Sequence, residues 1–262
     1  MKKFSSTKII IAVCIAICLV CAIILFLQLD SCDSTPGYEE TVLYPSTQES
    51  EEETSTATDE PTEPTEYVSP IDWESLKEQN SEIYAWLYIP GTEISYPIVQ
   101  SETDDTFYLT HDAYKVSYKG GAIFSEKAYN DLTFDEPVTL LYGHKLRSGA
   151  MLGTLQSTYN NSEGFEAHRD IIIYMPDKEL RYTVWASTEY SSDHIMYKYE
   201  KFIKPLNVTR FINEIKNIRS VEGQLDESLD VDCDDKFIVL STCLMGQVSR
   251  RYLVIAQLNT AE

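Results

Sequence analysis

The sequence contains few basic residues for its length. Its 262 residues include 21 Lys and Arg against 42 Asp and Glu, which gives a formal net charge of −21. Proteins that bind nucleic acids or anionic lipid surfaces use basic residues to neutralise phosphate groups, so this composition argues against both classes. Glycine and proline, at ten residues each, are too scarce for a collagen-like or low-complexity chain.

Cysteine is also sparse, and it is unevenly placed. The six cysteines lie at positions 14, 18, 21, 32, 233 and 243. This distribution forms neither a disulfide framework nor the CxxC pairs that are typical of a zinc site. No cluster of acidic residues has the spacing of a metal-binding loop, so we expect no metal and no cofactor.

One long hydrophobic run is present, near the N-terminus. Residues 9–27 carry no charge, and a helix of that length spans about 28 Å, close to the roughly 30 Å hydrocarbon core of a bilayer. Lysines precede the run and acids follow it, so the positive-inside rule places the N-terminus inside the cell. We expect a cytoplasmic tail at 1–8 and a single transmembrane anchor at 9–29, with the rest of the chain outside. A lipoprotein signal ending at Cys32 is the alternative, and Asp30 fits it poorly.

Two regions of different composition follow the predicted anchor. Residues 30–68 contain 12 acids and no Lys or Arg, mixed with Thr, Ser and Pro. Apolar residues are too sparse there to offset the entropy of ordering, so this region is predicted to be a disordered stalk. Residues 69–262 have a balanced globular composition and should form one extracellular domain.

Short apolar segments separated by turn residues dominate this domain. Strands are predicted over 94–99, 121–124, 137–142, 170–175, 180–187, 236–242 and 251–258. Amphipathic spacing predicts one helix from Pro70 to Lys77 and another over 208–219, and residues 149–159 are a candidate for a shorter helix. Many short strands with few helices favour a mainly β fold, a closed or nearly closed barrel with helical decoration.

Three chemically reactive side chains occur at the ends of predicted strands. Cys243 ends one buried strand, His144 follows another, and Arg251 begins the last one. A thiolate attacks carbonyl groups, a histidine can pair with it or protonate a leaving group, and a guanidinium can hold a developing oxyanion. Each residue alone is more often structural. Their combination predicts an enzyme that transfers acyl groups.

These motifs resemble those of the sortases, and among them class B. The segment from Tyr142 to His144 resembles the family's histidine motif, and the segment from Leu240 to Cys243 resembles its cysteine motif. Arg251, directly before an apolar strand, is similar to the family's arginine. Further segments of class B type lie upstream, so the resemblance covers about residues 71–258.

The resemblance implies both a fold and an activity. The fold would be a closed eight-stranded sortase β-barrel with N-terminal helices and a helix before the cysteine strand. The activity would be that of a membrane-anchored cysteine transpeptidase. Such an enzyme cleaves the C-terminal sorting signal of a secreted protein after Thr, holds the protein as a thioester on Cys243 and transfers it to an amine. The implied acceptor is a peptidoglycan precursor or a pilin.

The resemblance also implies roles for individual residues. His144, Cys243 and Arg251 would be catalytic, with no metal and no cofactor. Four residues match positions that line the groove for the sorting signal: Leu109, Tyr142, Ser241 and Thr242.

The sequence departs from the class B pattern at three places, one of which is the short connection between Cys243 and Arg251, so substrate contacts from that loop should differ. An acidic residue often follows the cysteine in class B, whereas Leu244 and Met245 follow it here. Asp105 stands where class B often has Asn. The preferred signal therefore need not be of the Asn-Pro-x-Thr type.

Two other interpretations remain open at the level of sequence. An L,D-transpeptidase also uses His and Cys on a β-rich domain, but its motif has Gly before the cysteine and Arg two residues after it, where Thr242 and Met245 stand here. A non-enzymatic anchored surface module with a structural thiol is the second alternative. A thiol-reactive probe separates this non-enzymatic alternative from the enzymes, because a buried structural Cys243 would stay unlabelled.

Overall fold

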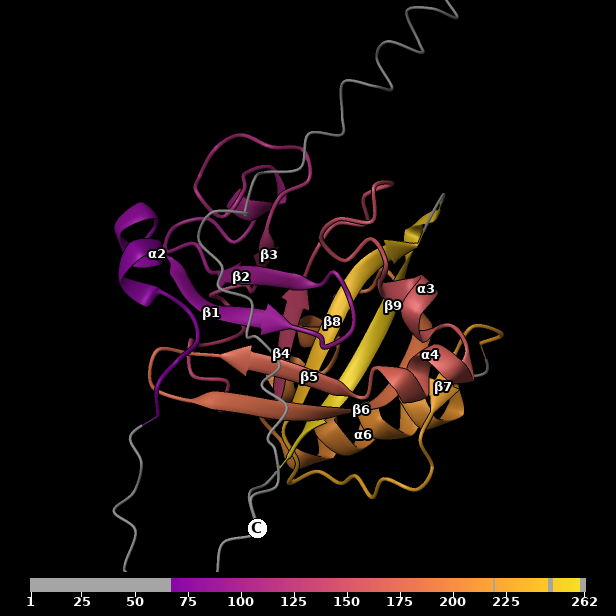
Figure 1. Cartoon of the computed structure of the whole chain (residues 1–262). Coiled ribbons are helices and arrows are strands. Elements are labelled where there is room, and N and C mark those ends of the chain that lie inside the picture. The colour runs from indigo at the N-terminus through magenta and orange to yellow at the C-terminus, as the bar shows by residue number, and fades with distance from the viewer. Residues whose placement is uncertain (1–66, 219, 245–246, 260–262) are drawn as a thin grey trace, which may run out of the picture. The chain divides into compact units, whose positions relative to one another are not determined.

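The computed structural model describes residues 67–218, 220–244 and 247–259, which fold around one mixed β-sheet. The strands are β1 (Ile83–Tyr88), β2 (Ser95–Val99), β3 (Ile123–Phe124), β4 (Val138–Tyr142), β5 (Asp170–Tyr174), β6 (Glu179–Ser191), β7 (Gln224–Leu225), β8 (Phe237–Leu244) and β9 (Gln247–Leu258). Their order is β5-β1-β2-β3-β4-β8-β9-β6-β7, and β5 also pairs with β6. This extra pairing closes all the described strands except β7 into an eight-stranded barrel (Figure 1). The predicted mainly β fold with a closed barrel is confirmed.

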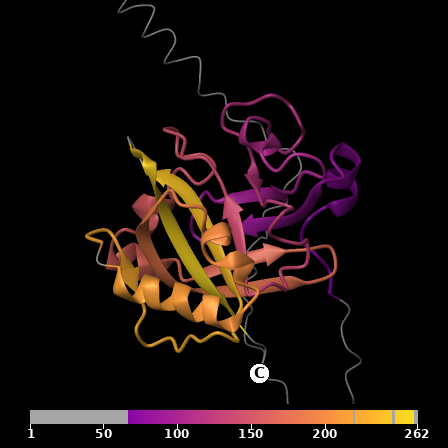
Figure 2. The same ribbon diagram turned by 180° about the vertical axis from the view of Figure 1, so that it is seen from behind.

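Short helices surround this barrel. Among the described residues they are α2 (Trp73–Gln79), α3 (Leu155–Tyr159), α4 (Ser162–Ala167), α5 (Ile195–Lys198), α6 (Pro205–Asn217) and the 3-10 helices η1 (Phe107–Leu109) and η2 (Glu200–Phe202). The longest of these, α6, lies across the outside of the barrel, and α2 lies at the far side beside β1 (Figures 1 and 2). The predicted helix before the cysteine strand is therefore present.

Strand alternation gives β8 and β9 two buried faces. Leu240 and Tyr252 belong to the core inside the barrel, while Val239 and Leu253 pack on the outer face in a cluster that includes Phe211 of α6. Side chains alternate between faces along a strand, so a strand covered on both sides reads as a continuous hydrophobic run. This is why the sequence before Cys243 lacks polar alternation.

All the predicted strands are present, with shifted ends. The largest differences are in β6 and β9, which extend well beyond 180–187 and 251–258. The helix predicted over 208–219 begins earlier, at Pro205, because proline suits the first turn of a helix. The prediction missed β1, β7, α4 and α5 and placed the start of α3 too early.

The predicted tail at 1–8, the predicted anchor at 9–29 and the stalk up to residue 66 lie outside the described residues. Within the part of the chain that is described, no helix is both long and apolar enough to span a bilayer.

Candidate active site

Two parallel strands bring the predicted histidine and cysteine to one face of the barrel. Tyr142 of β4 lies beside Ser241 of β8. One residue further on, the Gly143 N–H donates a hydrogen bond to the Ser241 carbonyl oxygen at 3.1 Å. Side chains two residues apart share a face of a sheet. His144 and Cys243 therefore project from the same outer face as Tyr142 and Ser241.

Arg251 reaches this face through the antiparallel pairing of β8 with β9. Cys243 and Arg251 are direct partners in the register, and residues directly opposite each other point to the same side. Arg250 is directed to the other side, where its Nη2 lies 2.7 Å from Glu189 Oε2. The geometry thus selects Arg251 over its neighbour as the guanidinium beside the thiol.

A groove with a cavity volume of about 230 Å³ runs over this face of the barrel. Its floor is formed by the ends of β4, β8 and β9, and its walls come from the segment 105–109 and from the connection between β6 and α5. The groove lining includes all the residues singled out from the sequence, which are Leu109, Tyr142, His144, Ser241, Thr242, Cys243 and Arg251.

The His144 ring is held at the rim of this groove. Its Nε2 lies 2.9 Å from the carbonyl oxygen of Leu109. Since a carbonyl only accepts hydrogen bonds, Nε2 carries the proton, and in a neutral ring Nδ1 is then the basic nitrogen. Gly121 makes this close packing possible, because it adopts a positive φ of 58° and a Cβ there would lie 2.5 Å from the Tyr108 carbonyl oxygen and 3.0 Å from His144 Cδ2.

The groove residues predicted from the resemblance occupy different positions. Leu109 is 40% exposed on one wall. The Tyr142 ring stacks on Phe124 with a centroid distance of 5.4 Å, and Ser241 lies on the floor. The Thr242 side chain is 1% exposed and points into the barrel, since it alternates with Cys243. Thr242 therefore contributes its main chain to the groove.

Two further groove residues, Glu126 and His194, were missed in the sequence. The His194 Nε2 lies 2.8 Å from Glu126 Oε2 and 3.5 Å from the Tyr142 hydroxyl oxygen. Burial raises the pKa of Glu126, and His194 and Tyr142 oppose that shift in part. Burial and the nearby Glu126 raise the pKa of Tyr142, so its hydroxyl stays protonated as a donor. No local sequence pattern predicts the contact between Glu126 and His194, because the two residues lie 68 positions apart in the chain.

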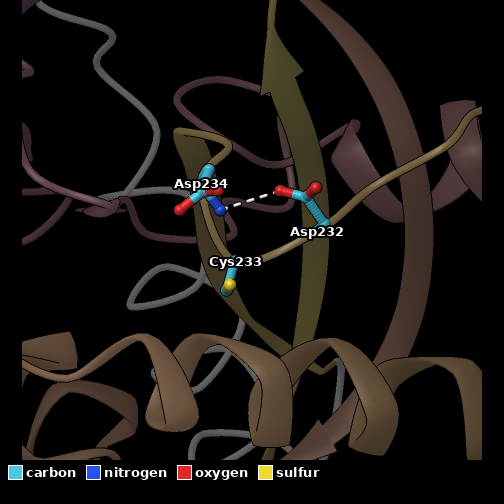
Figure 3. Close-up of side chains that lie close together, drawn as sticks. All are labelled: Asp232, Cys233 and Asp234. Atoms are coloured by element: carbon cyan, nitrogen blue, oxygen red, sulfur yellow. Dashed lines mark hydrogen bonds between the residues drawn. The ribbon is translucent and has the colours of Figure 1, made fainter.

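The other free cysteine of the described residues lies in an acidic turn outside the groove (Figure 3). Ligand atoms of Asp232, Cys233 and Asp234 lie within 4.8 Å of one another. The Asp234 N–H donates to Asp232 Oδ1 at 2.8 Å, and the Cys233 side chain packs against the outer core cluster that contains α6. These contacts describe a hydrogen-bonded turn, and we assign it no ligand.

Comparisons with known proteins agree with this geometry. No family model matches the sequence. The sequence is 28% identical to Sortase B of Staphylococcus aureus over 196 residues, which cover 74% of this chain and 76% of the relative. Among solved structures, the Staphylococcus aureus sortase B–substrate complex superimposes with a TM-score of 0.62 and 24% identity, covering 72% of this chain and 85% of the other.

A class B sortase of Streptococcus pyogenes, described as involved in pilus biogenesis, is also similar. It superimposes with a TM-score of 0.60 and 27% identity over 72% of this chain and 98% of its own. These similarities favour a sortase-type enzyme over an L,D-transpeptidase or a binding module without catalytic activity.

Proposed function

We propose that this chain, which is similar to class B sortases, is a cysteine transpeptidase that joins secreted proteins to an amine through a thioester on Cys243. The substrate is a protein with a C-terminal sorting signal, which the enzyme cleaves after Thr. The acceptor is an amine of a peptidoglycan precursor or of a pilin. The observation that carries this proposal is the placement of His144, Cys243 and Arg251 on one face at one groove.

The first half of the reaction forms the thioester. The Cys243 sulfur attacks the carbonyl carbon of the substrate Thr, and the thiol proton passes to Nδ1 of His144. The Arg251 guanidinium stabilises the negative charge that develops on the carbonyl oxygen. As the tetrahedral intermediate collapses, the peptide C–N bond breaks and His144 returns the proton to the leaving amine.

The second half transfers the protein to the acceptor. A neutral amine attacks the thioester carbonyl, and His144 takes the proton that the amine loses. The C–S bond then breaks, a new C–N bond remains, and the proton returns to the Cys243 sulfur. His144 and Cys243 are thereby restored for the next cycle.

A panel of peptides that contain Pro-x-Thr signals tests this proposal. We expect the full-length protein in detergent to cleave at least one peptide after Thr and to gain the mass of the acyl fragment on Cys243. Added amine should discharge this adduct and yield the amide product. Mass spectrometry of the digested enzyme locates the adduct, and an adduct on Cys233 would refute the assignment of the site.

Arg251 and Arg250 form a matched pair for a test of the oxyanion role. Arg251→Ala should lower kcat/KM for peptide cleavage on the order of 100-fold, as expected when one oxyanion donor is removed. Arg250→Ala should change it little, because that side chain pairs with Glu189 on the other side of β9 and exposed ion pairs contribute at most about 1 kcal/mol. The reverse ranking would show that the register is misassigned.

The hydrophobic run at 9–27 supports a location in the cell membrane. We propose that the chain crosses the membrane once at 9–29, with its N-terminus inside and the catalytic domain at the cell surface. The acidic stalk at 30–68 would hold that domain away from the bilayer. Protease added to cells without a wall should release the domain, and a domain protected until lysis would contradict this orientation.

A further inference from the structure

A carboxylate–imidazole pair lies in the groove on the inward side of Cys243. Glu126 follows β3 and His194 precedes α5, and both line the groove. The His194 Nε2 lies 3.5 Å from the hydroxyl oxygen of Tyr142, and Ser241, the register partner of Tyr142, lies two residues before Cys243 along β8. At about 3.3 Å per residue, Tyr142 therefore lies roughly 7 Å before Cys243, measured along the strands.

Contacts from several segments hold Glu126 in place. Asp105 accepts hydrogen bonds from the N–H groups of Lys127 at 2.7 Å and of Ala128 at 3.3 Å. On the other side of Glu126, the Ser125 hydroxyl lies 2.8 Å from the buried Tyr84 hydroxyl. The Glu126 side chain is 16% exposed, so it presents a small, fixed carboxylate edge to the groove.

The His194 ring supports the carboxylate as a neutral donor. Its Nε2 donates to Glu126, while its Nδ1 accepts a hydrogen bond from the Tyr197 N–H as the N-cap of α5. A ring that accepts through Nδ1 and donates through Nε2 carries no charge. The Tyr142 hydroxyl oxygen lies 3.5 Å from the same His194 Nε2. An ionised carboxylate offers about four acceptor positions, and His194 uses one of those of Glu126.

The charges that line the groove are divided between its two parts. Asp105 and Asp193 line the part of the groove around Glu126 and His194, whereas His144 and Arg251 line it beside Cys243. Among the described residues of the groove lining, Arg251 is the one side chain with a permanent positive charge. A substrate side chain that reaches the part around Glu126 thus meets acceptors and negative charge.

The order of the two half-reactions indicates which part of the substrate lies in the groove beside Glu126. The acyl fragment stays bound between the two half-reactions, whereas the leaving peptide must depart and the amine must enter. The acyl side therefore occupies the part of the groove around Glu126, and the exchanging groups use the rim. At about 3.3 Å per residue, the residue three before Thr lies about 10 Å from the thiol along the strands, beyond Tyr142 and towards its neighbours His194 and Glu126.

We propose that Glu126, supported by His194, forms a subsite that selects a lysine or arginine three residues before Thr in the sorting signal. This inference rests on the proposed function. It assigns Glu126 a role in specificity through contact with the substrate, and it assigns His194 the role of a positioning residue.

Peptides that differ only at that position test the subsite with the full-length enzyme in detergent. We expect the Lys and Arg peptides to acylate Cys243 with a kcat/KM about tenfold above that of the Met peptide, since a hydrogen bond between two charged groups is stronger than one between neutral groups. A Glu peptide should react most slowly. This comparison uses the unmodified enzyme, so it does not depend on the folding of a variant.

Variants then test whether Glu126 is the residue that causes the preference for the Lys peptide over the Met peptide. Glu126→Gln should bring the ratio of Lys to Met rates close to one, mainly through a higher KM for the Lys peptide. Glu163→Gln is the matched control, because Glu163 is an exposed carboxylate of α4 outside the groove, and it should preserve the ratio. His194→Gln should lower the Lys to Met ratio by a smaller factor than Glu126→Gln.

Two results would overturn the subsite in different ways. If the Met and Glu peptides acylate Cys243 as fast as the Lys peptide, the subsite is wrong and the transpeptidase function stands. If no peptide of the panel acylates Cys243, the proposed function fails and the subsite fails with it.

Discussion

Replacing Cys243 with alanine should abolish both peptide cleavage and the thioester adduct, because no other group in the mechanism can form the acyl-enzyme. The side chain is half-buried at the end of β8 and opens into the groove beside its register partner Arg251. Alanine leaves the strand and its packing intact, so circular dichroism of the variant should match the unmodified protein. The measurement is the mass of the enzyme after incubation with the best peptide of the panel.

Cys233→Ala is the matched control for this loss. Cys233 is the other free cysteine of the described residues, and it lies in the acidic turn against the outer core. That variant should retain cleavage and carry the adduct on Cys243. If Cys243→Ala still cleaved the peptide, Cys243 would not be the nucleophile, whatever the result with Cys233→Ala.

The relation of Cys243 to Arg251 could be predicted from the sequence, whereas that of Glu126 to His194 could not. A short connection between two apolar runs requires a hairpin, and the hairpin brings its two ends together. Glu126 and His194 lie on separate connections, and they meet only because β3 and β6 belong to one barrel. In the sequence His194 stands in a polar loop, with no sign of its carboxylate partner.

The closure of the barrel, like the contact between Glu126 and His194, depends on long-range contacts that the local sequence does not predict. The strand signal in the sequence is local, but closure depends on β1 pairing with β5 and on β5 pairing with β6. β1 was missed because Ile83–Tyr88 is a short, almost fully buried segment, and periodicity alone does not separate such a segment from a buried helix. The N-terminal half of the barrel was therefore less predictable than the strands that carry the thiol.

His144→Ala should lower kcat/KM for acylation by about 10²–10⁴-fold, the range for removal of a general acid–base group. His194 also lines the groove, but its Nε2 donates to Glu126 and its Nδ1 accepts from the Tyr197 N–H. Both nitrogens are thus engaged away from the thiol, and His194 should not replace His144. His168→Gln is the control, because that ring lies beside the Pro90 carbonyl oxygen and outside the groove.

A conservative variant separates proton transfer from a structural role of His144. Glutamine can donate a hydrogen bond to the Leu109 carbonyl oxygen, as His144 Nε2 does at 2.9 Å, but it cannot carry a proton between sulfur and amine. His144→Gln should therefore be as slow as His144→Ala, and added imidazole should restore part of the rate of the alanine variant. If His144→Gln kept nearly full activity, the ring would serve only to hold the segment 107–109, and another group would have to protonate the leaving amine.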